Sequence, residues 1–104
     1  MSKQTDRISK NEKRLNAARK VLDKLKTALN EYTENAEEIR KLEKYYTGGE
    51  WRKDFEAREN GRLPEDLRCG VLSEDAVYDL LTDESELLYS LSEVISRYQK
   101  ERNR

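Results

Sequence analysis

The chain has 104 residues, of which 41% are charged, and its formal net charge at pH 7 is only −1. This length predicts one domain, 1–104, and a highly charged but nearly neutral composition rich in Glu, Lys, Leu and Arg is typical of long helices or coiled coils. One cysteine and no histidine exclude an intramolecular disulfide, a zinc site of Cys and His ligands within one chain, and histidine-dependent catalysis. Because there is no long apolar run and no apolar signal region, we expect no membrane contact and a cytoplasmic location.

A long first helix is predicted over residues 5–46, since neither glycine nor proline occurs before Gly48. Its cap is expected at Thr5 or at Ser9, where Ser9 and Glu12 fit a capping box. Apolar residues recur along it in a seven-residue pattern with Ile8 as position a, and such a row must be buried against other helices. The members of this predicted assembly seam on the first helix are Ile8, Leu15, Leu22, Leu25, Leu29, Tyr32 and Ile39.

Two short helices are predicted in the middle section, over residues 50–60 and 64–69, the second with Pro64 at its first position and Leu67 facing inward. Aromatic and charged side chains are dense where this section follows the first helix. Two interpretations are open: these side chains line a pocket, or the aromatic ones plug the open end of a helix pair while a charged one bonds a helix terminus. The plug is favoured. The residues are Tyr45, Tyr46, Trp51, Arg52, Asp54 and Phe55.

The last long helix is predicted over residues 74–100, with Ser73 as its cap and acidic residues in its first turn. Its apolar positions include Leu80, Leu87 and Leu91, which continue the assembly seam, and its stripe is wider than a two-stranded seam needs. We therefore predict an all-α fold in which two long antiparallel helices form a coiled-coil-like hairpin, bridged by a short helical section. This hairpin is expected to dimerise into a four-helix core.

Two carboxylates interrupt these stripes, because Glu43 and Glu84 both fall at position a. A buried lone carboxylate is unfavourable, so each is expected to find a cation or hydrogen bonds, or to lie at a helix end. Polar residues at such positions often fix the register of helices, which is the favoured interpretation; a ligand site is the alternative.

Charge is unevenly distributed along the chain. Residues 1–30 contain nine basic and three acidic side chains, whereas residues 72–95 contain seven acidic side chains and no basic one. Opposite blocks on two helices favour mutual contact. In a simple hairpin the acidic helix would lie along the nearly neutral residues 24–46. The pairing therefore needs either a register shifted by the middle section or the acidic helix of a second copy, and the second copy is favoured.

Three motifs stand out in the middle of the chain: Tyr-Tyr-Thr-Gly-Gly-Glu-Trp from Tyr45, Gly-Arg-Leu-Pro from Gly61 and Gly-Val-Leu-Ser-Glu-Asp from Gly70. Together with two shorter stretches, they resemble a small bacterial family called domain of unknown function 4298. The resemblance implies a helical, bacterial, cytoplasmic protein and brings no established activity, so it implies no catalytic residue. The stretches are 45–51, 54–56, 61–64, 70–75 and 78–81.

The favoured hypothesis for function is a non-enzymatic protein–protein interaction or scaffold module that forms a homodimer and needs no cofactor or metal. A small metal-dependent phosphohydrolase, similar to the all-helical nucleotide pyrophosphatases, is one alternative, but its candidate ligands fall on the side of the first helix away from the seam. Weak nucleic-acid binding through the basic N-terminal third, where Arg7, Lys10 and Arg14 share a face, is another. The candidate metal ligands on that side of the first helix are Glu31, Glu34, Glu37 and Glu38, followed later in the chain by Asp75 and Asp79.

Overall fold

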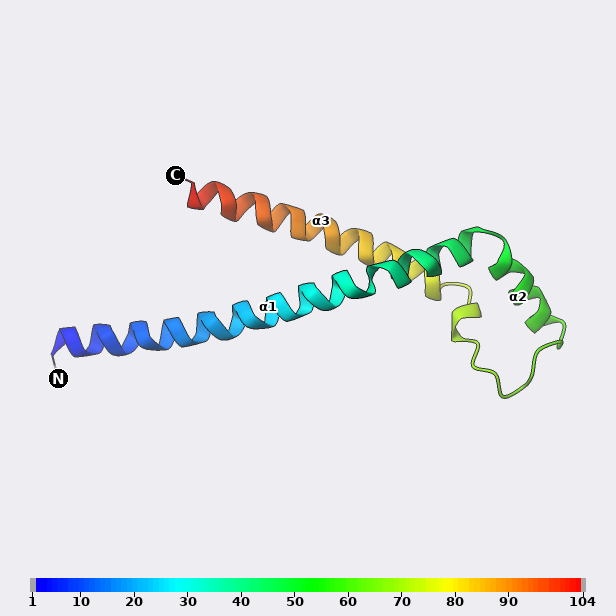
Figure 1. The fold of residues 1–104 in the computed structure, drawn as a ribbon, viewed down its shortest axis with the longest axis horizontal. Coiled ribbons are helices and arrows are strands. Elements are labelled where there is room, and N and C mark those ends of the chain that lie inside the picture. The colour runs from blue at the N-terminus through cyan, green and yellow to red at the C-terminus, as the bar shows by residue number, and fades with distance from the viewer. Residues whose placement is uncertain (1, 104) are drawn as a thin grey trace. The chain divides into compact units, whose positions relative to one another are not determined.

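The computed structural model describes residues 2–103, and every regular element within them is helical (Figure 1). Helix α1 spans Lys3–Thr47, α2 spans Glu50–Glu59 and α3 spans Ala76–Arg102, with a short 3₁₀ turn, η1, at Gly70–Leu72. The predicted all-α class is therefore confirmed. The chain divides into two units, one ending at Ile39 and the other beginning at Arg40.

Helix α1 is uninterrupted for 45 residues and begins earlier than predicted. The Ser2 hydroxyl accepts a hydrogen bond from the backbone N–H of Thr5 at 3.1 Å, and the Ser2 carbonyl accepts one from the N–H of Asp6 at 3.1 Å. Ser2 therefore satisfies free N–H groups of the first turn, and the caps predicted at Thr5 and Ser9 are wrong. Both residues lie inside the helix, because a competent cap was present upstream.

Two adjacent glycines end α1 for two different physical reasons. A Cβ atom on Gly48 would lie 2.8 Å from the backbone oxygen of Lys44, closer than a side chain can approach. Gly49 has φ 97°, a left-handed conformation that residues with a Cβ rarely adopt. The chain therefore turns sharply here, and α2 begins at the next residue.

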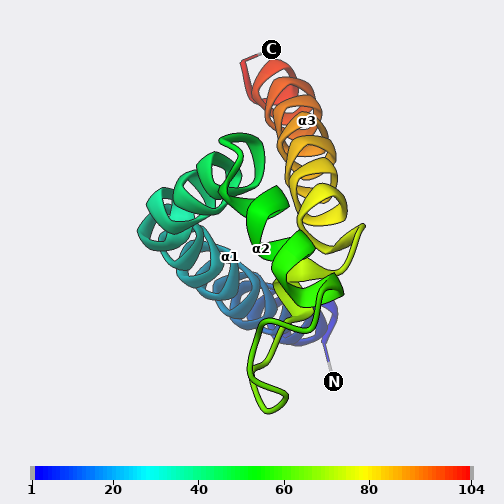
Figure 2. The same cartoon turned by 90° about the vertical axis from the view of Figure 1, so that its right-hand side faces the viewer.

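The segment after α2 differs from the prediction, because residues 64–69 form no helix. One turn bond, from the Leu67 N–H to the Pro64 carbonyl at 3.2 Å, is made there, and no helix follows it. Leu67 is 52% exposed, so its predicted inward orientation is also wrong. Figures 1 and 2 show this segment as an open loop that leads into η1.

Helix α3 starts at Ala76, two residues later than predicted, and Ser73 does not cap it. The Ser73 hydroxyl instead donates to the Gly70 carbonyl at 3.0 Å, so it closes η1. Asp75 precedes the helix without a side-chain cap bond, while Asp79 lies in the first turn, where negative charge is favourable. Lys100 and Arg102 occupy the last turn, which suits the opposite end of the helix dipole.

The apolar core of the described chain is very small. Within residues 2–103 only Leu72 and Val77 are buried, each 3% exposed. They lie on η1 and at the start of α3, and η1 contacts both α2 and α3. This core belongs entirely to the unit that begins at Arg40, whereas α1 contains no buried residue.

Candidate functional site

Three aromatic rings join the end of α1 to α2. The ring centroids of Tyr46 and Trp51 are 5.2 Å apart in an edge-to-face arrangement, and Trp51 stacks on Phe55 at 5.1 Å. The indole N–H of Trp51 donates to the Val71 carbonyl at 2.8 Å, which fastens η1 to the same cluster. All three rings are half-buried. These contacts support the interpretation of the rings as a structural plug.

A second contact between α1 and α2 is polar. The Tyr45 hydroxyl donates to Asp54 Oδ2 at 2.6 Å. Desolvation of the phenol, followed by this hydrogen bond and the negative charge of Asp54, raises the pKa of Tyr45 from 10.0 to about 12. Asp54 thus bonds a side chain rather than a helix terminus. Arg52 is exposed and makes no hydrogen bond or ion pair within residues 2–103, so the structure does not bring it into this junction.

A small cavity lies beside the Tyr45–Asp54 pair. Its volume is about 240 Å³, below the roughly 300–1,000 Å³ typical of small-molecule sites. A larger hollow of about 650 Å³, beside Ser92 and Ser96, is bounded by α3 alone and cannot enclose a ligand. The junction is therefore better suited to hold helices together than to bind a metabolite. The small cavity is lined mainly by Leu63, Leu67, Cys69, Val71 and Leu72, with Arg68 also present.

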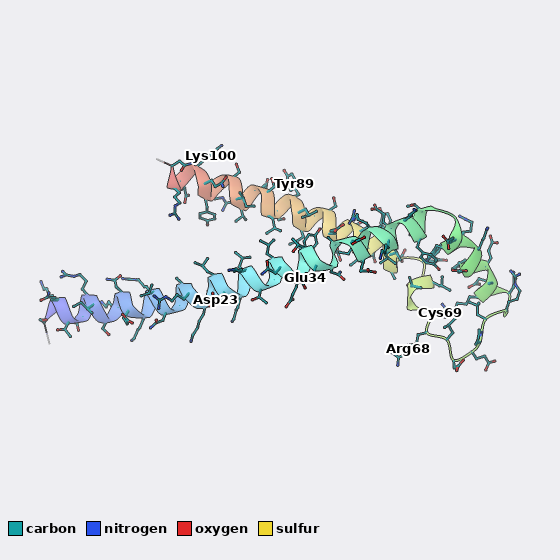
Figure 3. All side chains as sticks on the ribbon, viewed as in Figure 1. Asp23, Glu34, Arg68, Cys69, Tyr89 and Lys100 are labelled. Carbon is teal, nitrogen blue, oxygen red and sulfur yellow. The ribbon has the colours of Figure 1, made fainter. Side chains whose placement is uncertain are left out.

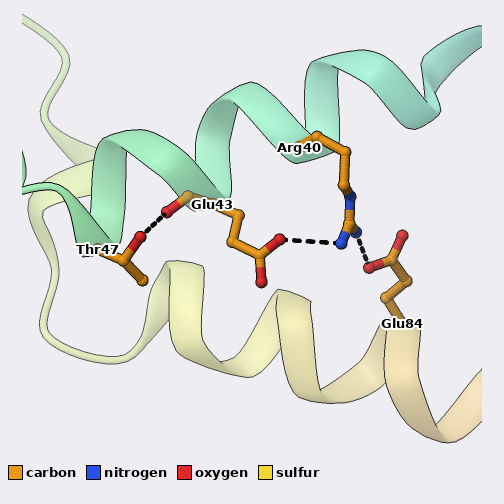
Figure 4. A network of polar contacts seen from close by, with 4 residues as sticks. All are labelled: Arg40, Glu43, Thr47 and Glu84. Carbon is orange, nitrogen blue, oxygen red and sulfur yellow. Dashed lines mark hydrogen bonds and ion pairs between the residues drawn. The ribbon is translucent and has the colours of Figure 1, made fainter.

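The two carboxylates at position a share one cation (Figure 4). Arg40 forms an ion pair with Glu43 at 2.9 Å, one turn along α1, and a second ion pair with Glu84 on α3. The Glu84 side chain is only 10% exposed. Both carboxylates therefore find a cation, which is one of the outcomes expected for them, and Arg40 links α3 to the last turns of α1.

Most of the predicted seam residues of α1 are exposed. Ile8, Leu15, Leu22, Leu25 and Leu29 are between 46% and 63% exposed, while Tyr32 and Ile39 are half-buried. Figure 3 shows side chains projecting from the whole length of α1, with Asp23 and Glu34 labelled. Monomeric proteins rarely expose an extended apolar row of this kind.

Helix α3 carries a comparable row. Leu80, Leu87 and Leu91 are 36% to 56% exposed, and further apolar side chains extend the row toward the end of the helix. Together with the row of α1, it makes up most of the large apolar surface of the described chain. The residues that extend this row are Leu88, Val94, Ile95 and Tyr98, and Tyr78 and Tyr89 are also exposed on α3.

Two groups that hold the helices together were not predicted from the sequence. The Val71 carbonyl accepts the Trp51 bond, and no sequence signal distinguishes one backbone carbonyl from another. Arg40 could have been found, because it lies three residues before Glu43 and such spacing brings side chains together on a helix.

Among residues 2–103, no three His, Cys, Asp or Glu side chains gather closely enough to hold a metal ion. In the same range, no helix combines the length and the apolar character needed to cross a bilayer.

The family described as "Domain of unknown function (DUF4298)" matches residues 8–94, which include the seam of α1, the aromatic junction and most of α3. The chain belongs to this family. The resemblance seen in the sequence is thus confirmed, and membership in the DUF4298 family brings no activity with it. No curated protein and no solved structure matches the chain.

Proposed function

We propose that this protein is a non-enzymatic interaction module that assembles with a second copy of itself through the apolar rows of α1 and α3. The observation that carries the proposal is the contrast between two buried side chains and two long exposed rows within residues 2–103. A stable domain normally buries the large apolar side chains that it exposes here.

Burial of these apolar rows lowers the free energy of the protein relative to leaving them in water. Complete burial of one leucine or isoleucine is worth about 1.5–3 kcal/mol, whereas an exposed ion pair contributes about 0–1 kcal/mol. Leu15, Leu22, Leu25 and Leu29 alone therefore represent several kcal/mol that a single copy leaves unused. This is comparable to the roughly 5–15 kcal/mol of net stability of a typical domain.

Two features support a second copy as the occupant. The chain is almost neutral overall, but its charges are divided into a basic block and an acidic block. The basic block of one copy is therefore complementary in charge to the acidic block of another. The apolar stripe of α3 is also broad, which is typical of a helix that contacts more than one neighbour. A four-helix core built from two copies satisfies both features.

The proposal is tested by one substitution and a matched control. Leu22→Asp places a charge in the apolar row, while Thr27→Asp places the same charge on the opposite side of α1 (heptad position f). We expect the natural chain to sediment as a dimer at micromolar concentration, Leu22→Asp to sediment as a monomer with reduced helicity, and Thr27→Asp to behave like the natural chain. A monodisperse monomer for the natural chain would overturn the proposal, as would a dimer that Leu22→Asp leaves intact.

A further inference from the structure

Two rows of opposite charge share one spacing. Lys3, Arg7 and Lys10 follow each other on α1 at intervals of four and three residues, and Arg14 continues this basic row. Asp79, Asp83 and Glu86 repeat the intervals of four and three on α3 and form an acidic row. Residues three and four apart lie on one face of a helix, so each set forms a continuous strip of charge.

Both strips are unused within one copy. All seven side chains are exposed, and none forms an ion pair within residues 2–103. The side chain of Arg14 bonds only Asn11, a neighbour on its own helix, at 3.1 Å. The strips also border the apolar rows, because Arg7 and Arg14 directly precede Ile8 and Leu15, and Asp83 lies one turn from both Leu80 and Leu87.

We propose that the basic row of one copy lies against the acidic row of a second copy, and that the pairing is reciprocal. The inference rests on the proposed self-association and specifies which surfaces meet. Charges beside an apolar seam select the partner and its orientation more than they add affinity. In a two-fold symmetric pair each favourable contact occurs twice, so even weak exposed pairs determine which arrangement forms.

The test uses charge reversal in two separate chains. The basic-row variant carries Arg7→Glu and Arg14→Glu, and the acidic-row variant carries Asp83→Lys and Glu86→Lys. The control variant carries Lys13→Glu and Lys20→Glu, which reverse two charges with the same spacing on the side of α1 away from the apolar row. Dissociation constants are measured by sedimentation at low salt, where exposed charges are least screened.

We expect each row variant alone to dissociate about tenfold more readily than the natural chain, because like charges then face each other. An equimolar mixture of the two row variants should form heterodimers, detected by mass in native mass spectrometry, with the natural affinity restored. One chain that carries all four reversals should again form homodimers, which shows that the variants still fold. The control variant should keep the affinity of the natural chain.

The two proposals fail in different ways. If the natural chain is a monomer, self-association itself is wrong. If the natural chain is a dimer but both row variants dimerise equally well, only the charge pairing is overturned. If both row variants are weakened and their mixture forms no heterodimer, the rows do not pair between copies, and the inference is again overturned.

Discussion

Individual side chains show what a sequence pattern can indicate about polar contacts. The positions of Glu43 and Glu84 predicted that each would find a cation or hydrogen bonds, or lie at a helix end, and one arginine, Arg40, pairs with both. The need was predictable because a carboxylate in an apolar stripe is unfavourable without a cation. That one arginine would pair with both carboxylates was not predictable, because this depends on where α3 crosses the last turns of α1.

The Tyr45–Asp54 hydrogen bond leads us to predict how the stability of the folded chain depends on pH. The raised pKa of Tyr45 means that the folded chain holds the phenol proton more tightly than the unfolded chain does. The contribution to stability is therefore complete below pH ~10, the unfolded pKa, and is lost as the pH rises through about 12. Above the folded pKa, a phenolate would face the Asp54 carboxylate at hydrogen-bond distance.

This prediction is measured by tyrosinate absorbance. Subtracting the titration of Tyr45→Phe from that of the natural chain isolates the ionisation of Tyr45, and we expect a midpoint near 12. Asp54→Asn should lower the midpoint only partly, because desolvation is the largest cause of the shift. A difference curve centred near 10 in the natural chain would contradict this account.

Among the helices, continuity was predictable and irregular backbone was not. Residues 3–47 contain no glycine or proline, so the local preference for helix is unopposed and α1 forms as one element. The predicted helix at 64–69 failed because a proline at a first helical position permits a helix but does not supply the following backbone bonds. Here one bond, between Leu67 and Pro64, closes a turn and the chain then leaves it.

The glycine pair after α1 gives a test of backbone conformation. Gly49→Ala should lower the free energy of unfolding by about 1–2 kcal/mol, because alanine disfavours a positive φ. Gly70→Ala is the matched control, since a Cβ there meets no atom within 4 Å and the φ of Gly70 is not in the left-handed region. It should change the free energy by less than about 0.5 kcal/mol in denaturant titrations. Equal effects of the two substitutions would show that φ at Gly49 is not the cause.

For the whole chain, the sequence predicted which apolar surfaces would associate but not what covers them. The heptad pattern grouped the apolar positions from Ile8 to Ile39 as one row, and the uninterrupted α1 is compatible with this grouping because a continuous helix fixes which side chains share a face. The partner could not be predicted in the same way, because hydrophobic burial has no direction and many surfaces satisfy it. The aromatic residues of the junction were predictable because large rings that lie close together in the sequence must pack against one another or against a neighbouring element.

Self-association predicts that thermal stability depends on concentration. Raising the protein concentration about tenfold should raise Tm by roughly 2–4 °C, because the folded state then gains free energy by mass action. Leu22→Asp should remove this dependence. Scanning calorimetry over a range of concentrations gives the measurement, and a Tm independent of concentration in the natural chain would argue for a monomeric folded state.

The single tryptophan has a practical consequence for experiments. Trp51 contacts Tyr46 edge-to-face and stacks on Phe55 in the unit that begins at Arg40, so its fluorescence reports on that unit alone. Circular dichroism, by contrast, is weighted toward α1 as the longest helix. Comparing the two signals during denaturation reveals whether the two units melt together or in succession, without any added label.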